Sequence, residues 1–215
     1  MCELKNELKE KEILLNKTFK YSEKKKLQED INFLKMVINS GDNKKETWSD
    51  IFKLGDKAEA YFAKLCKDRG NEYFKSDIST DMKKHIDCYV LTEDNRRVSV
   101  DVKAIKKTSR QGKFDDSVQW IEFKNTYGGK GWLYGEADII AFQFNSGFYL
   151  VNRESLVEYC NTLLENAQTF HKKYVKQPIP FYEKYTRHNC KDLVMKVKMK
   201  DILKNCRVSR WLDEN

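Results

Sequence analysis

The stretch HIDCYVLTEDNRRVSVDVK, residues 85–103, decides the fold that this sequence predicts. Two strand-like runs, 85–91 and 97–103, flank a polar turn at 93–95, which is the pattern of a β-hairpin. Because side chains alternate along a strand, Asp101 and Lys103 share one face. A three-residue turn would place Asp87 directly opposite Asp101, about 5 Å away. The hairpin therefore gathers two carboxylates and one ammonium group.

A helix is predicted upstream of this hairpin, at about residues 55–69. Its apolar positions recur at helical spacing, and Gly70 is a suitable C-terminal stop. Glu59 lies at the edge of the apolar stripe, near the boundary of the core. The stripe consists of Ala58, Tyr61, Phe62 and Leu65.

The rest of the chain alternates between strand-like and helix-like segments. We predict a strand at 119–124, a hairpin of 138–144 with 148–151, a helix from Arg153 to about Asn166, a strand at 193–199 and a short helix near 200–205. This order predicts an α/β or α+β fold with a central mixed β-sheet flanked by helices.

The first part of the chain has a different character. Residues 3–39 contain no glycine or proline, and their leucines and isoleucines recur at helical spacing, which predicts a helical hairpin or short coiled coil. We therefore expect an arm at 1–46, which packs or forms a homodimer without chemistry of its own, and a second domain at 47–215.

The net charge of +8 favours a polyanionic partner such as nucleic acid. Residues 1–50 carry 11 Lys and 10 Asp or Glu, so seven of the eight surplus charges lie in the rest of the chain. The apolar runs are too short to span a bilayer and the N-terminus has no signal-peptide pattern, so we expect an intracellular protein without a membrane partner. Six cysteines without a C-x-x-C motif argue for reduced thiols and against a zinc site.

The hairpin residues suit hydrolysis of a phosphodiester. Two carboxylates hold a hard cation such as Mg²⁺ or Mn²⁺, which polarises the phosphate and lowers the pKa of a bound water. Lys103 can orient that water or neutralise developing charge, and Glu59 can complete the metal shell. The alternative is a structural ion pair between Asp101 and Lys103.

This arrangement resembles the PD-(D/E)xK nuclease superfamily: Glu59 lies on a helix, Asp87 begins a hairpin, and Asp101-Val102-Lys103 lies on its second strand. Residues 101–104, 120–125 and 131–138 are also similar to uncharacterised proteins of phages and large DNA viruses. The resemblance covers roughly residues 50–205 and implies a restriction-endonuclease-like core. It implies that Asp87 and Asp101 are metal ligands, Lys103 the catalytic lysine and Glu59 an accessory ligand. Ile86 stands where many members have proline.

By this resemblance the chain is expected to be a Mg²⁺- or Mn²⁺-dependent endo- or exodeoxyribonuclease, located in the host cytoplasm or nucleoid if viral. A catalytically inactive nuclease-fold module, binding nucleic acid or a partner protein, is the alternative. A virion or assembly protein, with residues 3–39 as its oligomerisation element, is a third class.

Further candidates lie around the predicted site. The basic loop after the second strand is expected to contact phosphate through Lys106, Lys107, Arg110 and Lys113, together with Lys130. Glu122-Phe123-Lys124 is a second acid-x-Lys triplet, ranked lower because no aspartate precedes it at hairpin distance. The glycines at 128–131 are interpreted as a turn, and Trp132 and Tyr134 as core residues, with base stacking as the alternative.

Overall fold

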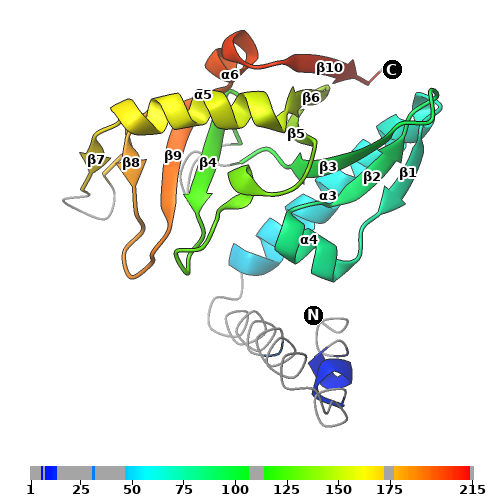
Figure 1. Ribbon diagram of the computed structural model, residues 1–215, viewed down its shortest axis with the longest axis horizontal. Helices are drawn as coiled ribbons and strands as arrows, with labels where there is room; N and C mark the ends of the chain where they lie inside the picture. Colours follow the sequence, from blue (N-terminus) through cyan, green and yellow to red (C-terminus); the bar gives the residue numbers. More distant parts are fainter. Residues whose placement is uncertain are drawn as a thin grey trace. The chain divides into compact units, whose positions relative to one another are not determined.

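The computed structural model describes residues 6, 8–13, 31, 47–106, 114–171 and 177–213 (Figure 1). The chain divides into two compact units, Met1–Leu54 and Gly55–Asn215. The predicted arm at 3–39 lies largely outside the described residues; within it, residues 8–13 are helical. Within the described part of the chain, no helix has both the length and the apolar character needed to cross a membrane.

A six-stranded mixed sheet forms one half of the second unit, in the order β1-β2-β3-β5-β6-β10. Its neighbours run antiparallel except β3 and β5, which are parallel. The predicted hairpins are confirmed as β2–β3 and β5–β6. The strands are β1 (Glu72–Lys75), β2 (Cys88–Leu91), β3 (Arg97–Lys103), β5 (Ile139–Phe144), β6 (Gly147–Asn152) and β10 (Val208–Leu212).

A second sheet of four strands, in the order β4-β9-β8-β7, corrects the prediction of a single central sheet. The mixed α/β composition is confirmed, but β4 does not join β3. Both edges of β3 are occupied by β2 and β5, so β4 pairs antiparallel with β9 instead. The strands are β4 (Val118–Lys124), β7 (Thr169–Phe170), β8 (Lys184–Tyr185) and β9 (Leu193–Lys198).

The helices agree with the sequence prediction in part. The helix expected at 55–69 begins earlier, as α3 (Thr47–Asp68), because Gly55 lies inside the helix and does not interrupt it. The helix ends before Gly70, whose φ is 73°. The helices α5 (Arg153–Asn166) and α6 (Met199–Asn205) are close to prediction. The helix α4 (Ile78–Lys84) and the short 3₁₀ helix η1 (Trp132–Tyr134) were not predicted.

The six-stranded sheet is covered on both faces. On one face α3 packs through Phe62, whose ring centroid lies 5.1 Å from that of Phe148 on β6 and 5.7 Å from that of Trp211 on β10. On the other face Ile140 and Phe142 of β5 join a core shared with β4, β9, α5 and α6. Figure 1 shows α5 crossing over β9 and β4 at the top of this second layer.

The register of β3 with β5 places charged side chains in the layer between the two sheets. Asp101 pairs with Ile140, and Lys103 pairs with Phe142. Laterally paired residues in a sheet point to the same face, so Asp101 and Lys103 project toward the core that Ile140 and Phe142 help to form. Val100 and Val102 point to the face that α3 covers.

Gly147 offers a test of how tightly β10 closes the sheet. Its φ is 148°, and an added Cβ would lie 1.9 Å from the backbone oxygen of Trp211. We expect Gly147→Ala to lower the free energy of unfolding by about 2–4 kcal/mol, measured by denaturant titration. The matched control is Gly55→Ala in α3, where an added Cβ meets no described atom within 4 Å. This control should raise stability by about 0.5–1 kcal/mol, and an equal effect of both changes would contradict the tight approach of β10.

Candidate functional site

The β2–β3 hairpin has the predicted turn. Leu91 pairs with Arg97, and the Thr92 N–H donates to the Arg96 carbonyl at 3.0 Å, which leaves residues 93–95 as the loop. The strand predicted at 85–91 is shorter than expected, because His85 ends α4 in the left-handed conformation, with φ of 53°. The last ladder pair, Cys88 with Val100, comes one pair before Asp87 and Asp101.

Asp101 and Lys103 form a buried ion pair at the C-terminal end of β3. Lys103 Nζ lies 2.5 Å from Asp101 Oδ1, and the side chains are 19% and 1% exposed, respectively. The second oxygen, Asp101 Oδ2, is buried without a hydrogen-bond partner. Lys103 Nζ also lies 4.9 Å from the ring centroid of Trp132 on η1, which closes one side of the site. The alternative offered by the sequence, an ion pair, is therefore present, but it satisfies only one of the two oxygens.

Burial dominates the electrostatics of this pair. Burial raises the pKa of Asp101 to about 7, Lys103 partly offsets that effect, and the neighbouring Asp87 carboxyl raises the pKa further. Burial also lowers the pKa of Lys103, but Asp101 and Asp87 outweigh this and leave the pKa raised above its ordinary value. Lys103 therefore remains an ammonium group, while Asp101 takes up a proton readily when no further cation is near.

Asp87 lies where the β2–β3 ladder stops. Its N–H donates to the Val100 carbonyl at 2.9 Å, and its Oδ2 accepts from the Val102 N–H at 2.6 Å. The backbone N–H of Asp87 therefore bonds to Val100 and its carboxylate to Val102, the two residues that flank Asp101 in the chain. Asp87, Asp101 and Lys103 are brought together as the sequence predicted.

Asp81 on α4 is a fourth charged residue of this site, and the sequence analysis missed it. Burial raises the pKa of Asp81 to about 7, and the Asp87 carboxyl adds to that effect through charge and a hydrogen bond. The signal in the sequence was Asp77, a residue type that caps helices. In the structure Asp77 accepts a hydrogen bond from the Thr80 N–H at 3.0 Å and caps the short helix that carries Asp81.

Glu59 lies at the margin of the site. It is half-buried on α3, which agrees with its predicted position at the edge of the apolar stripe. Its Oε2 lies 3.0 Å from Lys75 Nζ on β1. Burial raises the pKa of Glu59, Lys75 lowers it, and Asp87 raises it. Glu59 therefore shares the electrostatic field of Asp87, with its carboxylate engaged by Lys75.

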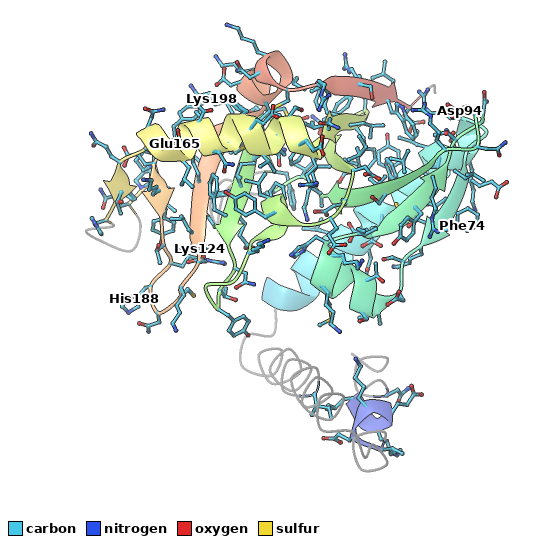
Figure 2. The ribbon with its side chains drawn as sticks, viewed as in Figure 1. Phe74, Asp94, Lys124, Glu165, His188 and Lys198 are labelled. Atoms are coloured by element: carbon cyan, nitrogen blue, oxygen red, sulfur yellow. The ribbon has the colours of Figure 1, made fainter. Side chains whose placement is uncertain are left out.

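Glu122 on β4 faces the same region from the second sheet. Burial raises the pKa of its carboxyl, whereas Arg187 and Lys103 lower it. Lys124, the other member of this triplet, is exposed at the end of β4 (Figure 2), after an irregularity in the β4–β9 register. The triplet therefore does not repeat the Asp101–Lys103 geometry, although Glu122 adds negative charge beside Lys103.

The residues predicted to contact phosphate are described in part. Lys107, Arg110 and Lys113 lie outside the described residues. Burial lowers the pKa of Lys106, and so does Lys103, which places Lys106 within the field of the site. Lys130 is exposed at the end of the turn that follows β4.

The glycine cluster forms a turn, as interpreted. An added Cβ at Gly131 would lie 2.1 Å from the backbone oxygen of Glu122, so only glycine fits there. Trp132 and Tyr134 pack against the core around the buried Leu133, and the Tyr134 hydroxyl donates to Asn161 Oδ1 at 2.7 Å. These contacts favour the core interpretation of the two aromatic residues.

The donor set at Asp87 and Asp101 suits a hard divalent cation. Among the described residues, no three His, Cys, Asp or Glu side chains are grouped as a metal site. Mg²⁺, however, is usually held by one or two carboxylates, with water and substrate phosphate as the other ligands. The buried, unpartnered Oδ2 of Asp101 beside the Asp87 carboxyl meets that requirement.

Comparisons with known proteins add no relative. The chain matches no family model, and searches of curated proteins and of solved structures each gave no significant match. The chemistry of the site therefore rests on its own residues, and the resemblance to PD-(D/E)xK nucleases stays a prediction.

The pKa of Asp101 predicts a pH-dependent stability. A carboxyl whose pKa rises from 3.8 unfolded to about 7 folded stabilises the protein fully below pH 3.8, and this contribution is lost as the pH rises through about 7. Asp101→Asn mimics the protonated form. At about pH 8 without divalent ions we therefore expect its free energy of unfolding to exceed that of the parent protein by about 2–4 kcal/mol.

The difference should shrink to less than about 1 kcal/mol near about pH 4, where the folded parent carboxyl is protonated and the unfolded one is partly protonated. Denaturant titrations at both pH values measure it. The control Asp68→Asn, at a half-exposed site on α3, should change stability by less than about 0.5 kcal/mol at either pH. A destabilised Asp101→Asn at the higher pH would refute the assigned cost of burying Asp101.

Proposed function

We propose that this protein is a Mg²⁺- or Mn²⁺-dependent nuclease that hydrolyses phosphodiester bonds, with DNA as its substrate. One observation carries the proposal: a buried aspartate, Asp101, has one oxygen paired to Lys103 at 2.5 Å and the other without a partner. Asp87 lies beside it at the end of the same hairpin. A carboxylate left half-satisfied in a core is costly, and a bound cation would remove that cost.

In this proposal Asp87 and Asp101 hold the metal ion, and Asp81 interacts with Asp87 through charge and a hydrogen bond. The ion supplies Lewis acidity, which polarises the phosphate and lowers the pKa of a bound water. Asp87 keeps its own orientation through the Val102 N–H. Glu59 is an accessory acid: its carboxylate either stays paired with Lys75 or leaves Lys75 to bind the metal ion.

Lys103 is the proposed catalytic lysine. Its raised pKa keeps Nζ protonated, so it can donate to a phosphate oxygen or to the attacking water. The Trp132 ring and the Asp101 carboxylate hold Nζ from two sides. A lysine held this way loses little side-chain freedom on binding substrate.

The fold and the net charge support the proposal. The site lies on β3, which is flanked by antiparallel β2 and parallel β5 in a mixed sheet, and we propose that this sheet with α3 is a restriction-endonuclease-like core. The net charge of +8 suits a polyanion. The choice of DNA rests on the resemblance to PD-(D/E)xK nucleases over roughly residues 50–205.

Cleavage assays test the proposed activity directly. Plasmid, single-stranded DNA and RNA are incubated with the full chain in Mg²⁺, Mn²⁺ or EDTA. We expect DNA cleavage with either metal ion, none in EDTA, and a loss of at least about 100-fold in Asp101→Ala and in Lys103→Ala. Arg96→Ala, at the exposed turn, is the control and should keep full activity. A protein that binds DNA but cleaves no substrate under any metal condition would instead be an inactive nuclease-fold module.

Metal binding can be tested apart from catalysis. Mn²⁺ at about 100 times its dissociation constant should stabilise the protein by about 2.7 kcal/mol and raise its melting temperature. Asp101→Asn should abolish this shift, because it removes a ligand charge, whereas Asp68→Asn should keep it. An unchanged shift in Asp101→Asn would place the ion elsewhere.

A further inference from the structure

Two loops from the second sheet form a common surface beside the site. The first follows β4 and the second connects β8 to β9; together we call residues 124–130 and 186–192 the paired loops. The Lys191 N–H donates to the Thr126 carbonyl at 3.1 Å. An added Cβ at Gly128 would lie 3.3 Å from Lys191 Cβ, so the loops are closely packed. Figure 2 shows Lys124 and His188 at this end of the sheet.

The paired loops present positive charge without an exposed acid. Their four cations are exposed, and their single acid, Asp192, has a side chain that is 0% exposed. Tyr127, also on this surface, is 57% exposed. A surface with this charge attracts a polyanion, and an aromatic side chain on it suits stacking with a base. The cations are Lys124, Lys130, Arg187 and Lys191.

Arg187 is fixed by a buried carboxylate. Asp192 accepts the Arg187 backbone N–H at 2.9 Å through Oδ1 and the Arg187 Nε–H through Oδ2. Burying a carboxylate is costly, and here both of its oxygens serve one arginine. The Arg187 side chain is nevertheless 47% exposed, and the recorded bond to Asp192 uses one of the five guanidinium N–H donors. The arrangement holds an arginine in one orientation at the surface.

Glu122 links this arginine to the candidate site. Both Arg187 and Lys103 act on the Glu122 carboxyl, so Glu122 lies within electrostatic range of each. Gly131, which follows the first of the paired loops, lies close to the backbone of Glu122. It also begins η1, whose first residue, Trp132, lies beside Lys103. The paired loops therefore adjoin Asp101 and Lys103 on the side of the second sheet.

We propose that Arg187, oriented by Asp192 and supported by Lys130 and Lys191, binds the phosphate backbone of the nucleic-acid strand that enters the site. This inference rests on the proposed nuclease function and assigns the surface that holds the substrate. Arginine suits the role because its planar fork matches a phosphate in two-point geometry, which lysine cannot do.

Binding in EDTA separates this inference from cleavage. Fluorescence anisotropy with short labelled single-stranded and duplex DNA is measured on the full chain across a salt series. Arg187→Ala should weaken binding about 5–10-fold and reduce the salt slope by about one. Arg187→Lys, which keeps the charge but loses the fork, should fall between the parent and Arg187→Ala.

Asp192→Asn is the decisive variant. It adds one positive charge to the protein, so attraction by bulk charge alone would tighten binding. Our proposal expects weaker binding by several-fold. The amide has one acceptor oxygen where the carboxylate has two, so it cannot accept both the backbone N–H and the Nε–H of Arg187, and the guanidinium loses its orientation. Melting temperatures check that the variant is folded; if it is not, the comparison of Arg187→Lys with Arg187→Ala decides the question.

Arg96→Ala is the matched control. Arg96 is also an exposed arginine whose Nε lies 2.5 Å from an aspartate, Asp94, but it belongs to the turn at the far end of the β2–β3 hairpin. Its loss should change affinity by less than about two-fold. Equal effects of Arg187→Ala and Arg96→Ala, or tighter binding by Asp192→Asn, would overturn the inference.

The two proposals fail in different ways. A protein that binds DNA through Arg187 but never cleaves it refutes the nuclease and retains the binding surface. A protein that cleaves DNA, while Arg187→Ala binds and cleaves like the parent, refutes the binding surface alone. Absence of DNA binding by the parent protein in this series would overturn the inference and leave an acidic protein as the partner to examine.

Discussion

The buried pair of Asp101 and Lys103 is the interaction on which the site depends. It sits between two sheets, on a strand whose opposite face carries valines, and a carboxylate in such a layer is costly unless both of its oxygens are satisfied. Lys103 satisfies one oxygen, and the other has no partner. The surrounding core must be stable enough to hold this arrangement, as expected for a site where function is favoured over stability.

The acids around this pair divide into two groups. Asp87 and Asp81 interact with each other at the end of β2 and on α4, whereas Glu59 is engaged by Lys75 on β1. The motif order made Glu59 the expected third acid. In the folded chain Asp81 interacts electrostatically with both Asp87 and Asp101, and the left-handed residue His85 ends the α4 helix that carries it.

Local patterns in the sequence predicted the hairpin, its turn and the shared face of Asp101 and Lys103, because alternation and turn composition are properties of adjacent residues. The second sheet was not predictable in this way, since β4 pairs with a strand that comes some seventy residues later in the chain and no local signal specifies that partner. Asp81 was missed because α4 is short and has no fully buried residue, so its sequence shows no apolar stripe. The Arg187–Asp192 pair is local in sequence, but only its burial gives it meaning.

The two sheets are interleaved along the chain. After β3 the chain leaves the first sheet for β4, returns for β5 and β6, supplies β7, β8 and β9 to the second, and closes the first with β10. A nascent chain that has emerged only as far as β6 has all the acids of the site but leaves β4 without its ladder partner and the face above Asp101 without β9. The cover over the site is therefore among the last features to form during synthesis, and folding is expected to be slow because it depends on these distant pairings.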